Sequence, residues 1–268
     1  MSRRSRRNKT NNSLPIVIIG LVLALLAVFI YQYMQVVQDK IDTDPATNCR
    51  ADGFFPRDTV ILLDATQAVS QAQLEGISNQ LESVIRESMI HERFTIYFLQ
   101  DEPERFQPKL LVCNPGTGQN LSSATNNLRK LLEHYEESFK APVKGAIDGL
   151  AGVASSKFSP IMEMLKFVGL RTFARSTSSD KRLILVSDMV ENTDSYSQYL
   201  NRKLNFDELS KTPYFREMRP RLTDVFIDVL YIERSELSRI QNGDHISKFW
   251  QPFVRRSGGQ INKVTYIN

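Results

Sequence analysis

A long apolar run near the start of the chain constrains the fold more than any other sequence feature. Residues 14–34 read LPIVIIGLVLALLAVFIYQYM and carry no charged side chain. About 20 apolar residues, at 1.5 Å of rise each, cross a hydrocarbon core of about 30 Å as a helix. Tyr31 and Tyr33 close the run, where aromatic rings favour the membrane interface. We therefore predict one transmembrane helix over residues 14–34.

A cleaved signal peptide is the alternative interpretation of this run. Signal peptides carry an apolar region of about 7–15 residues that ends in a small-x-small cleavage site. Here the run is longer and ends in FIYQYM. An uncleaved anchor is therefore the favoured interpretation.

The charges on either side of the run predict its orientation. The first thirteen residues contain five basic residues and no acidic ones, whereas Asp39, Asp42 and Asp44 follow the run with only Lys40 between them. Basic residues are retained on the cytoplasmic side of membranes. We expect a cytoplasmic tail over residues 1–13 that touches anionic lipid headgroups, and a periplasmic or extracellular remainder.

The net charge of the whole chain reflects this tail. The sequence has 34 Lys and Arg against 30 Asp and Glu, and removing the five basic residues of the tail leaves 29 against 30. The exported part is therefore close to neutral, which argues against nucleic acid as a partner. Its expected partners are a protein at the membrane and, through residues 14–34, the lipid bilayer.

The two cysteines, Cys49 and Cys113, both lie in the part predicted to be exported. In an oxidising compartment a pair of thiols favours a disulfide. Two unrelated buried cysteines are the alternative.

The hydrophobic pattern after the anchor predicts an α/β domain. Residues 35–57 are polar and end near Pro56, which indicates a stalk or linker before a domain over residues 58–268. Apolar runs typical of strands occupy residues 59–66, 93–100, 109–113, 182–188, 225–233 and 261–267. Helical periodicity lies between them, over residues 74–85, 128–139, 143–150, 206–215 and 245–259, and in a helix opened by Ser159-Pro160.

Alternating strands and helices predict a doubly wound, mostly parallel six-stranded sheet covered on both faces. The short link before residues 109–113 predicts one antiparallel edge strand. Asp64 and Asp188 end two of the parallel strands, so we expect them at the rim where such sheets build their sites. Cys113 ends a strand of the opposite direction, so a disulfide to Cys49 is expected at the other rim.

Three local segments carry a family resemblance: VILLDATQA at the first strand, FSPIMEML at a helix start and LILVSDMVEN after the fourth strand. Together with the order of elements, they resemble a von Willebrand factor A-type (VWA) domain over residues 59–268. The resemblance implies a divalent-metal site built from an Asp-x-Ser-x-Ser motif, a threonine on a second loop and an aspartate on a third. Oxygen ligands of this kind suit Mg²⁺.

Residue by residue, the resemblance implies the metal ligands Asp64, Thr66, Ser159 and Asp188. Ala68 stands where the motif has its second serine and offers no side-chain oxygen. The site is therefore degenerate. The alternative is that Asp64 and Thr66 cap the first loop by hydrogen-bonding backbone amides.

Other chemistry has little support in the sequence. No glycine-rich phosphate cradle follows the first strand, and the three histidines form no triad or zinc spacing. Phe249, Trp250 and Phe253 have the spacing of core residues. We expect no enzyme, but a protein-interaction module of an envelope-associated complex, with residues 191–221 as the partner-contacting region. A Mg²⁺-dependent ligand-binding domain and a metal-dependent hydrolase using Asp64 and Asp188 are the alternatives.

Overall fold

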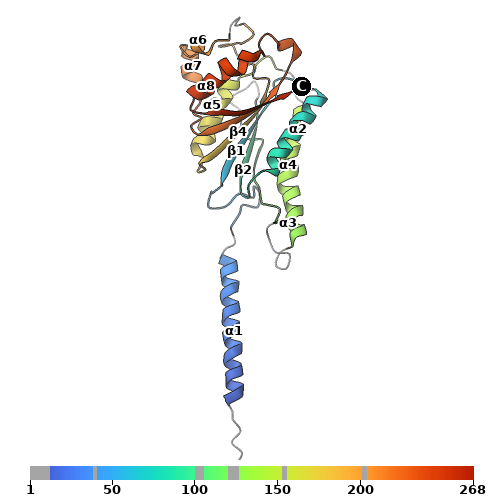
Figure 1. Cartoon of the computed structure of the whole chain (residues 1–268), viewed down its shortest axis with the longest axis vertical. Coiled ribbons are helices and arrows are strands. Elements are labelled where there is room, and N and C mark those ends of the chain that lie inside the picture. Colours follow the sequence, from blue (N-terminus) through green and yellow to red (C-terminus); the bar gives the residue numbers. More distant parts are fainter. Residues whose placement is uncertain (1–12, 39–40, 100–105, 120–126, 153–155, 201–203) are drawn as a thin grey trace, which may run out of the picture. The chain divides into compact units, whose positions relative to one another are not determined.

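A computed structural model of the chain describes residues 13–38, 41–99, 106–119, 127–152, 156–200 and 204–268 (Figure 1). The chain divides into two compact units, Met1–Asp42 and Thr43–Asn268.

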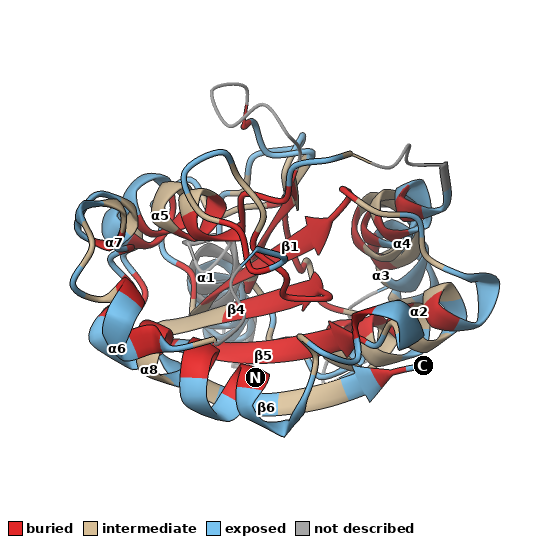
Figure 2. Cartoon of the chain, turned by 90° about the horizontal axis from the view of Figure 1, so that it is seen from above, coloured by how far each residue is buried: buried red, intermediate tan, exposed pale blue. Residues whose placement is uncertain are grey.

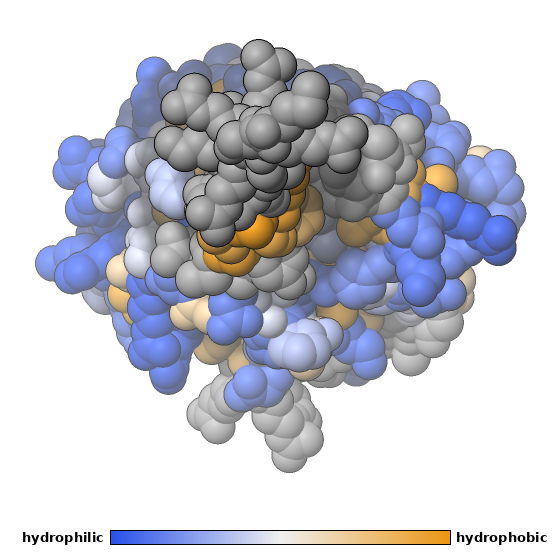
Figure 3. Space-filling view, turned by 90° about the horizontal axis from the view of Figure 1, so that it is seen from below, coloured by the Kyte–Doolittle hydropathy of each residue, from blue (hydrophilic) through white to orange (hydrophobic). Residues whose placement is uncertain are grey.

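In the described residues of the first unit, helix α1 (Ser13–Gln38) covers the predicted anchor over residues 14–34. The structure describes its side chains at residues 17–19 and 21–31, and all of these are exposed and mostly hydrophobic, as their orange colour in Figure 3 shows. Within the described part of the chain, no helix combines the length and the apolar character needed to span a membrane. Residues 1–12 of the predicted cytoplasmic tail lie outside the described residues.

The second unit is built on a six-stranded sheet with the strand order β3-β2-β1-β4-β5-β6. All neighbouring strands are parallel except β3, which pairs antiparallel with β2 at the edge. The predicted fold class and its antiparallel edge strand are therefore confirmed. The strands are β1 (Arg57–Asp64), β2 (Arg93–Leu99), β3 (Leu110–Cys113), β4 (Asp180–Ser187), β5 (Val225–Ile232) and β6 (Gln260–Ile267).

The central strand β1 shows why its sequence is apolar without alternation. Successive side chains of a strand point to opposite faces, and both faces of this sheet are covered by helices (Figure 2). Val60 and Leu62 enter the core on one face, and Ile61 and Leu63 enter the core on the other. All four side chains are fully buried.

One face of the sheet is covered by α2 (Gln71–Arg86), α3 (Leu128–Tyr135), a π-helical turn η2 (Glu136–Lys140), α4 (Ala141–Asp148) and a 3₁₀ turn η3 (Gly149–Gly152). Helix α2 begins with a capping box, in which Ser70 accepts from the Gln73 amide while the Gln73 side chain accepts from the Ser70 amide. Its buried stripe of Ile77, Leu81 and Ile85 packs on the sheet with the 3.6-residue period.

The other face is covered by α5 (Ile161–Arg171), η4 (Phe173–Arg175), α6 (Phe206–Leu209), α7 (Pro213–Met218), η6 (His245–Trp250) and α8 (Gln251–Arg256), with η5 (Ser235–Leu237) after β5. The helix predicted over residues 206–215 is in fact two short helices, because Thr212 caps a new start at Pro213. Phe249, Trp250 and Phe253 are fully buried here, which confirms their assignment to the core.

The predicted disulfide is present and joins Cys49 to Cys113. Cys113 pairs in register with Arg93, the first residue of β2, so the bond lies at the rim where the parallel strands begin, as predicted. Residues 43–57 of the predicted stalk belong to the second unit. Thr47 O accepts from the Cys113 amide, and Phe55 is buried. The polar composition of this segment concealed these backbone contacts.

Candidate functional site

The carboxyl ends of β1 and β4 bring the first candidate residues together. Asp64 ends β1 beside Ser187, the last residue of β4, because Leu63 pairs in register with Val186. Asp64 Oδ1 accepts from the Thr66 amide at 3.0 Å and from the Thr66 hydroxyl at 2.6 Å. Asp64 Oδ2 accepts from the hydroxyls of Ser187 at 2.6 Å and Ser159 at 3.5 Å. Oδ1 thus holds the loop after β1 in shape, and Oδ2 joins this loop to β4 and to the loop that carries Ser159.

Asp188 follows β4 and is paired with a cation of the chain itself. Its Oδ1 accepts from the Val190 amide at 2.9 Å, and its Oδ2 accepts from Arg234 Nε at 2.9 Å. Arg234 Nη1 also donates to the carbonyl of Ala68 at 3.0 Å. One guanidinium therefore connects the loop after β1, the loop after β4 and the loop after β5.

The Gln241 side chain links Arg234 to the loop after β4. Its side-chain oxygen accepts from the Arg234 amide at 2.7 Å. Its amide nitrogen donates to the carbonyls of Asp188 at 3.0 Å and Ile232 at 2.8 Å. The loops after β4 and β5 are therefore joined by the Gln241 side chain as well as by the ion pair between Arg234 and Asp188.

Burial perturbs the carboxylates on this side of the sheet. Asp188 is only 3% exposed, and burial together with the negative charge of Asp64 raises its pKa. The nearby Arg234 and the Val190 amide oppose this rise. The ion pair with Arg234 therefore stabilises the charged form of Asp188.

Glu191 is a second buried carboxylate, and it closes the start of α5. It is fully buried, accepts from the Met162 amide at 2.9 Å and accepts from the Tyr214 hydroxyl at 2.9 Å. Burial raises its pKa to about 8. This changes the expected cap: the sequence predicted Ser159 as the N-cap and Pro160 as the first helical residue, whereas Pro160 occupies the cap position and the Ser159 hydroxyl faces Asp64.

The loop after β4 is fixed by the one tryptophan of the chain. Met189 adopts the left-handed conformation (φ 61°), which is strained for a residue with a side chain. Trp250 Nε1 donates to Met189 O at 2.8 Å and approaches His245 Nε2 at 3.2 Å. His245 is fully buried, and this burial lowers its pKa to about 4. His245 is therefore a neutral structural histidine.

The outer surface of the rim exposes large apolar side chains. Isolated bridges link Ser159 to Asn192 and Asn192 to Ser197, so the second and third loops form one surface. Beside these bridges Phe158 is 38% exposed, Tyr199 is 44% exposed and Leu200 is 84% exposed. Gln67 on the first loop donates to the Tyr199 hydroxyl at 3.2 Å. We call Phe158, Tyr199 and Leu200 the rim patch.

The residues at this rim do not fit the divalent-metal site implied by the sequence. Asp64, Thr66 and Ser159 lie together, but Ala68 supplies only a carbonyl, and that carbonyl accepts from Arg234. Asp188 lies at the same rim, but its Oδ2 accepts from the same guanidinium. Across the described residues, no cluster of three or more His, Cys, Asp or Glu could hold a metal ion. Hard divalent cations need several free oxygen ligands, and here these ligands are engaged.

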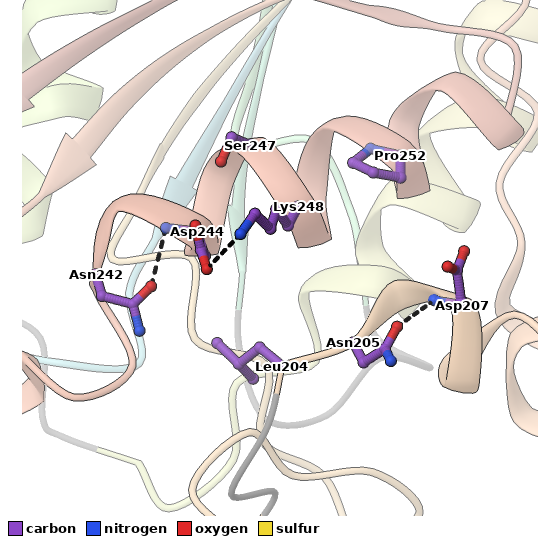
Figure 4. Close-up of a pocket in the computed structure, with 8 residues that line it drawn as sticks. All are labelled: Leu204, Asn205, Asp207, Asn242, Asp244, Ser247, Lys248 and Pro252. Carbon is purple, nitrogen blue, oxygen red and sulfur yellow. Dashed lines mark hydrogen bonds and ion pairs between the residues drawn. The ribbon is translucent and has the colours of Figure 1, made fainter.

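A hollow of about 630 Å³ lies elsewhere, between the start of α6 and the segment that leads into η6 (Figure 4). Its polar groups are occupied locally: Asn205 accepts from the Asp207 amide, Asn242 accepts from the Asp244 amide, and Lys248 pairs with Asp244 at 2.9 Å. The two asparagines bond amides at helix starts, the ion pair runs along one helix, and these contacts do not converge on a ligand position.

No family model and no curated protein matches the sequence. Among solved structures, the chain is similar to a von Willebrand factor type A protein from Catenulispora acidiphila, with 12% identity, a TM-score of 0.41, and coverage of 80% of this chain and 39% of that one. It is also similar to proximal thread matrix protein 1 from the mussel byssus, with 15% identity, a TM-score of 0.37, and coverage of 78% and 41%. The chain thus matches about two fifths of each protein's length. Similarities of this size assign no ligand and no residue role here.

The structure therefore places Asp64, Thr66, Ser159 and Asp188 at one rim. Their partners there are groups of the chain itself, whereas the resemblance implied a metal ion. Sequence reasoning missed Ser187, Arg234 and Gln241. Ser187 had a usable signal, since it precedes Asp188 at a strand end and faces Asp64 once the register is known. Arg234 and Gln241 lie in a loop and belong to no recognisable motif.

Proposed function

We propose that this chain is a membrane-anchored, exported, VWA-like protein-interaction module that docks a protein partner on its rim patch, as part of an envelope-associated complex. The observation that carries the proposal is the rim itself. It exposes Phe158, Tyr199 and Leu200 beside polar groups that are already hydrogen-bonded to one another.

The chemistry of the rim patch supports binding. Exposed aromatic and aliphatic side chains grouped around a polar centre are typical of interaction surfaces, and tyrosine is enriched among the residues that dominate binding energy. Hydrolysis would instead require a group free to activate water. Asp64 and Asp188 accept hydrogen bonds from Thr66, Ser187 and Arg234, which leaves them poorly suited to that role.

The proposed anchor and orientation rest on the N-terminal segment. The apolar residues 14–34 coincide with the helix Ser13–Gln38, and five basic residues precede them. The disulfide between Cys49 and Cys113 is consistent with an oxidising compartment.

Site-specific photo-crosslinking in the full-length chain tests the docking surface. A photoreactive residue in place of Leu200 is expected to give a discrete crosslinked species in membranes. The matched control replaces Leu132 on α3, which is also exposed, at 48%. Crosslinking at Leu132 but at none of the three rim-patch positions would refute the proposal.

Topology is tested separately. A C-terminal reporter that is active only in the cytoplasm should remain silent, and one active only after export should function. The reverse result would overturn the proposed orientation and localisation while leaving the rim patch untouched.

A further inference from the structure

The geometry points to Arg234 as a built-in replacement for the divalent cation, so that the rim is held together without metal. This inference concerns what joins the loops, goes beyond the proposed function, and does not depend on which partner binds. Its basis is the position of one guanidinium between the buried carboxylate of Asp188 and the backbone carbonyl of Ala68.

Two buried carboxylates at neighbouring strand ends need a compensating positive charge. Asp64 is 6% exposed and Asp188 is 3% exposed, so water screens neither well. The two lie close together, because Ser187, which directly precedes Asp188, donates its hydroxyl to Asp64 Oδ2 at 2.6 Å. The Arg234 side chain is itself only 12% exposed and lies 2.9 Å from Asp188. The pair is therefore a partly desolvated charge contact and not a surface ion pair.

Arg234 also makes the connection that Ala68 has lost. Ala68 has no side-chain oxygen, but its carbonyl accepts from Arg234 Nη1 at 3.0 Å. A planar guanidinium with several fixed donors can join an acidic and a carbonyl oxygen on two loops at once. Where the resemblance implies a serine hydroxyl as a metal ligand, this chain thus has an alanine whose carbonyl binds a cationic side chain.

The position of Arg234 is fixed in advance. Its backbone amide donates to Gln241, and Gln241 in turn donates to the carbonyl of Asp188. These contacts fix the backbone from which the Arg234 side chain extends, so less conformational freedom is lost when the guanidinium pairs with Asp188. A divalent ion at the same oxygens would meet the like charge of the Arg234 guanidinium.

Metal titration of the full-length chain in detergent tests the inference. For the natural sequence we expect no saturable binding of Mn²⁺ or Mg²⁺ by calorimetry, and no change in melting temperature when a chelator is added. The double variant Ala68→Ser/Arg234→Ala restores an oxygen and removes the charge. It is expected to show saturable Mn²⁺ binding that the natural chain lacks.

A second variant keeps the test informative if the double variant does not fold. Arg234→Ala alone is expected to melt at a lower temperature than the natural chain, and Mn²⁺ should raise this melting temperature again. Arg234→Lys should melt closer to the natural chain than Arg234→Ala does. Arg255→Ala removes an exposed arginine and should show no response to Mn²⁺. Saturable metal binding by the natural chain that is lost in Asp64→Ala overturns the inference. So does a folded Arg234→Ala chain whose melting temperature ignores Mn²⁺.

Discussion

Replacing Glu191 by glutamine should make the fold less sensitive to pH. Glu191 is fully buried, and its pKa rises from 4.5 in the unfolded chain to about 8 in the folded chain. The folded state therefore binds more protons than the unfolded state between these values. The free energy of unfolding must then fall as the pH rises through this window.

The structure also indicates that glutamine fits the same place. The glutamine oxygen can accept from the Met162 amide, as Glu191 does now. Its amide nitrogen can donate to the Tyr214 hydroxyl, which lies 3.5 Å from Thr193 Oγ1 and can donate to it. The variant thus keeps both contacts and loses only the titrating proton.

The magnitude follows from the pKa difference. From about pH 5 to about pH 7, nearly one proton separates the two states, which corresponds to a loss of about 2.5 kcal/mol for the natural chain. Glu191→Gln should not show this part of the loss. The slope due to Asp188, whose raised pKa acts in the same direction, remains in both proteins and cancels in the comparison.

Urea unfolding at several pH values measures this directly. Trp250 is the only tryptophan and is fully buried, so its fluorescence reports on the folded domain of the full-length chain. Glu236→Gln, at an exposed position, is the matched control. If the natural chain and Glu191→Gln lose stability equally between pH 5 and pH 7, the reasoning about this buried carboxylate is wrong.

Three further outcomes are expected. Replacing Cys49 and Cys113 together by serine opens a loop of 64 residues and should cost about 4 kcal/mol in urea unfolding, so an unchanged midpoint would contradict the role of the disulfide. Trp250→Phe removes the donor to Met189 O and should cost about 2 kcal/mol by thermal melting, whereas a neutral effect would mean that this bond does not fix the loop. Crosslinking through position 200 should be unaffected by a chelator, and its loss on chelation would show that the rim patch depends on metal.

The strands could be predicted because their signal is local. In β1 and β4 a continuous apolar run ends in a polar residue, which identifies the strands, and the helices between the strands predict their parallel direction. The site could be predicted only in part. Asp64 and Asp188 mark strand ends, but the contact of Arg234 with Ala68 joins residues 166 positions apart and depends on how two loops fold back. No local pattern contains that information.

Ser159 illustrates the same limit from the other direction. A serine before a proline is a good local signal for a helix start. Glu191, 29 residues from Met162, provides the cap instead, so Ser159 is free to turn towards Asp64. A contact between distant residues thus caps the helix, and the Ser159 side chain bonds Asp64 at the rim instead.

The covalent link between Cys49 and Cys113 also determines how the second unit responds to tension. The bond encloses β1, α2, β2 and most of β3 in one loop, so a pull on the two chain ends cannot extend them. Force instead passes through the sulfur atoms and reaches the sheet at the end of its edge strand. About 220 Å of extensible chain is thereby withheld until the bond is reduced. Under a pull on the two chain ends, the disulfide thus carries force past β1 and protects this central strand from extension.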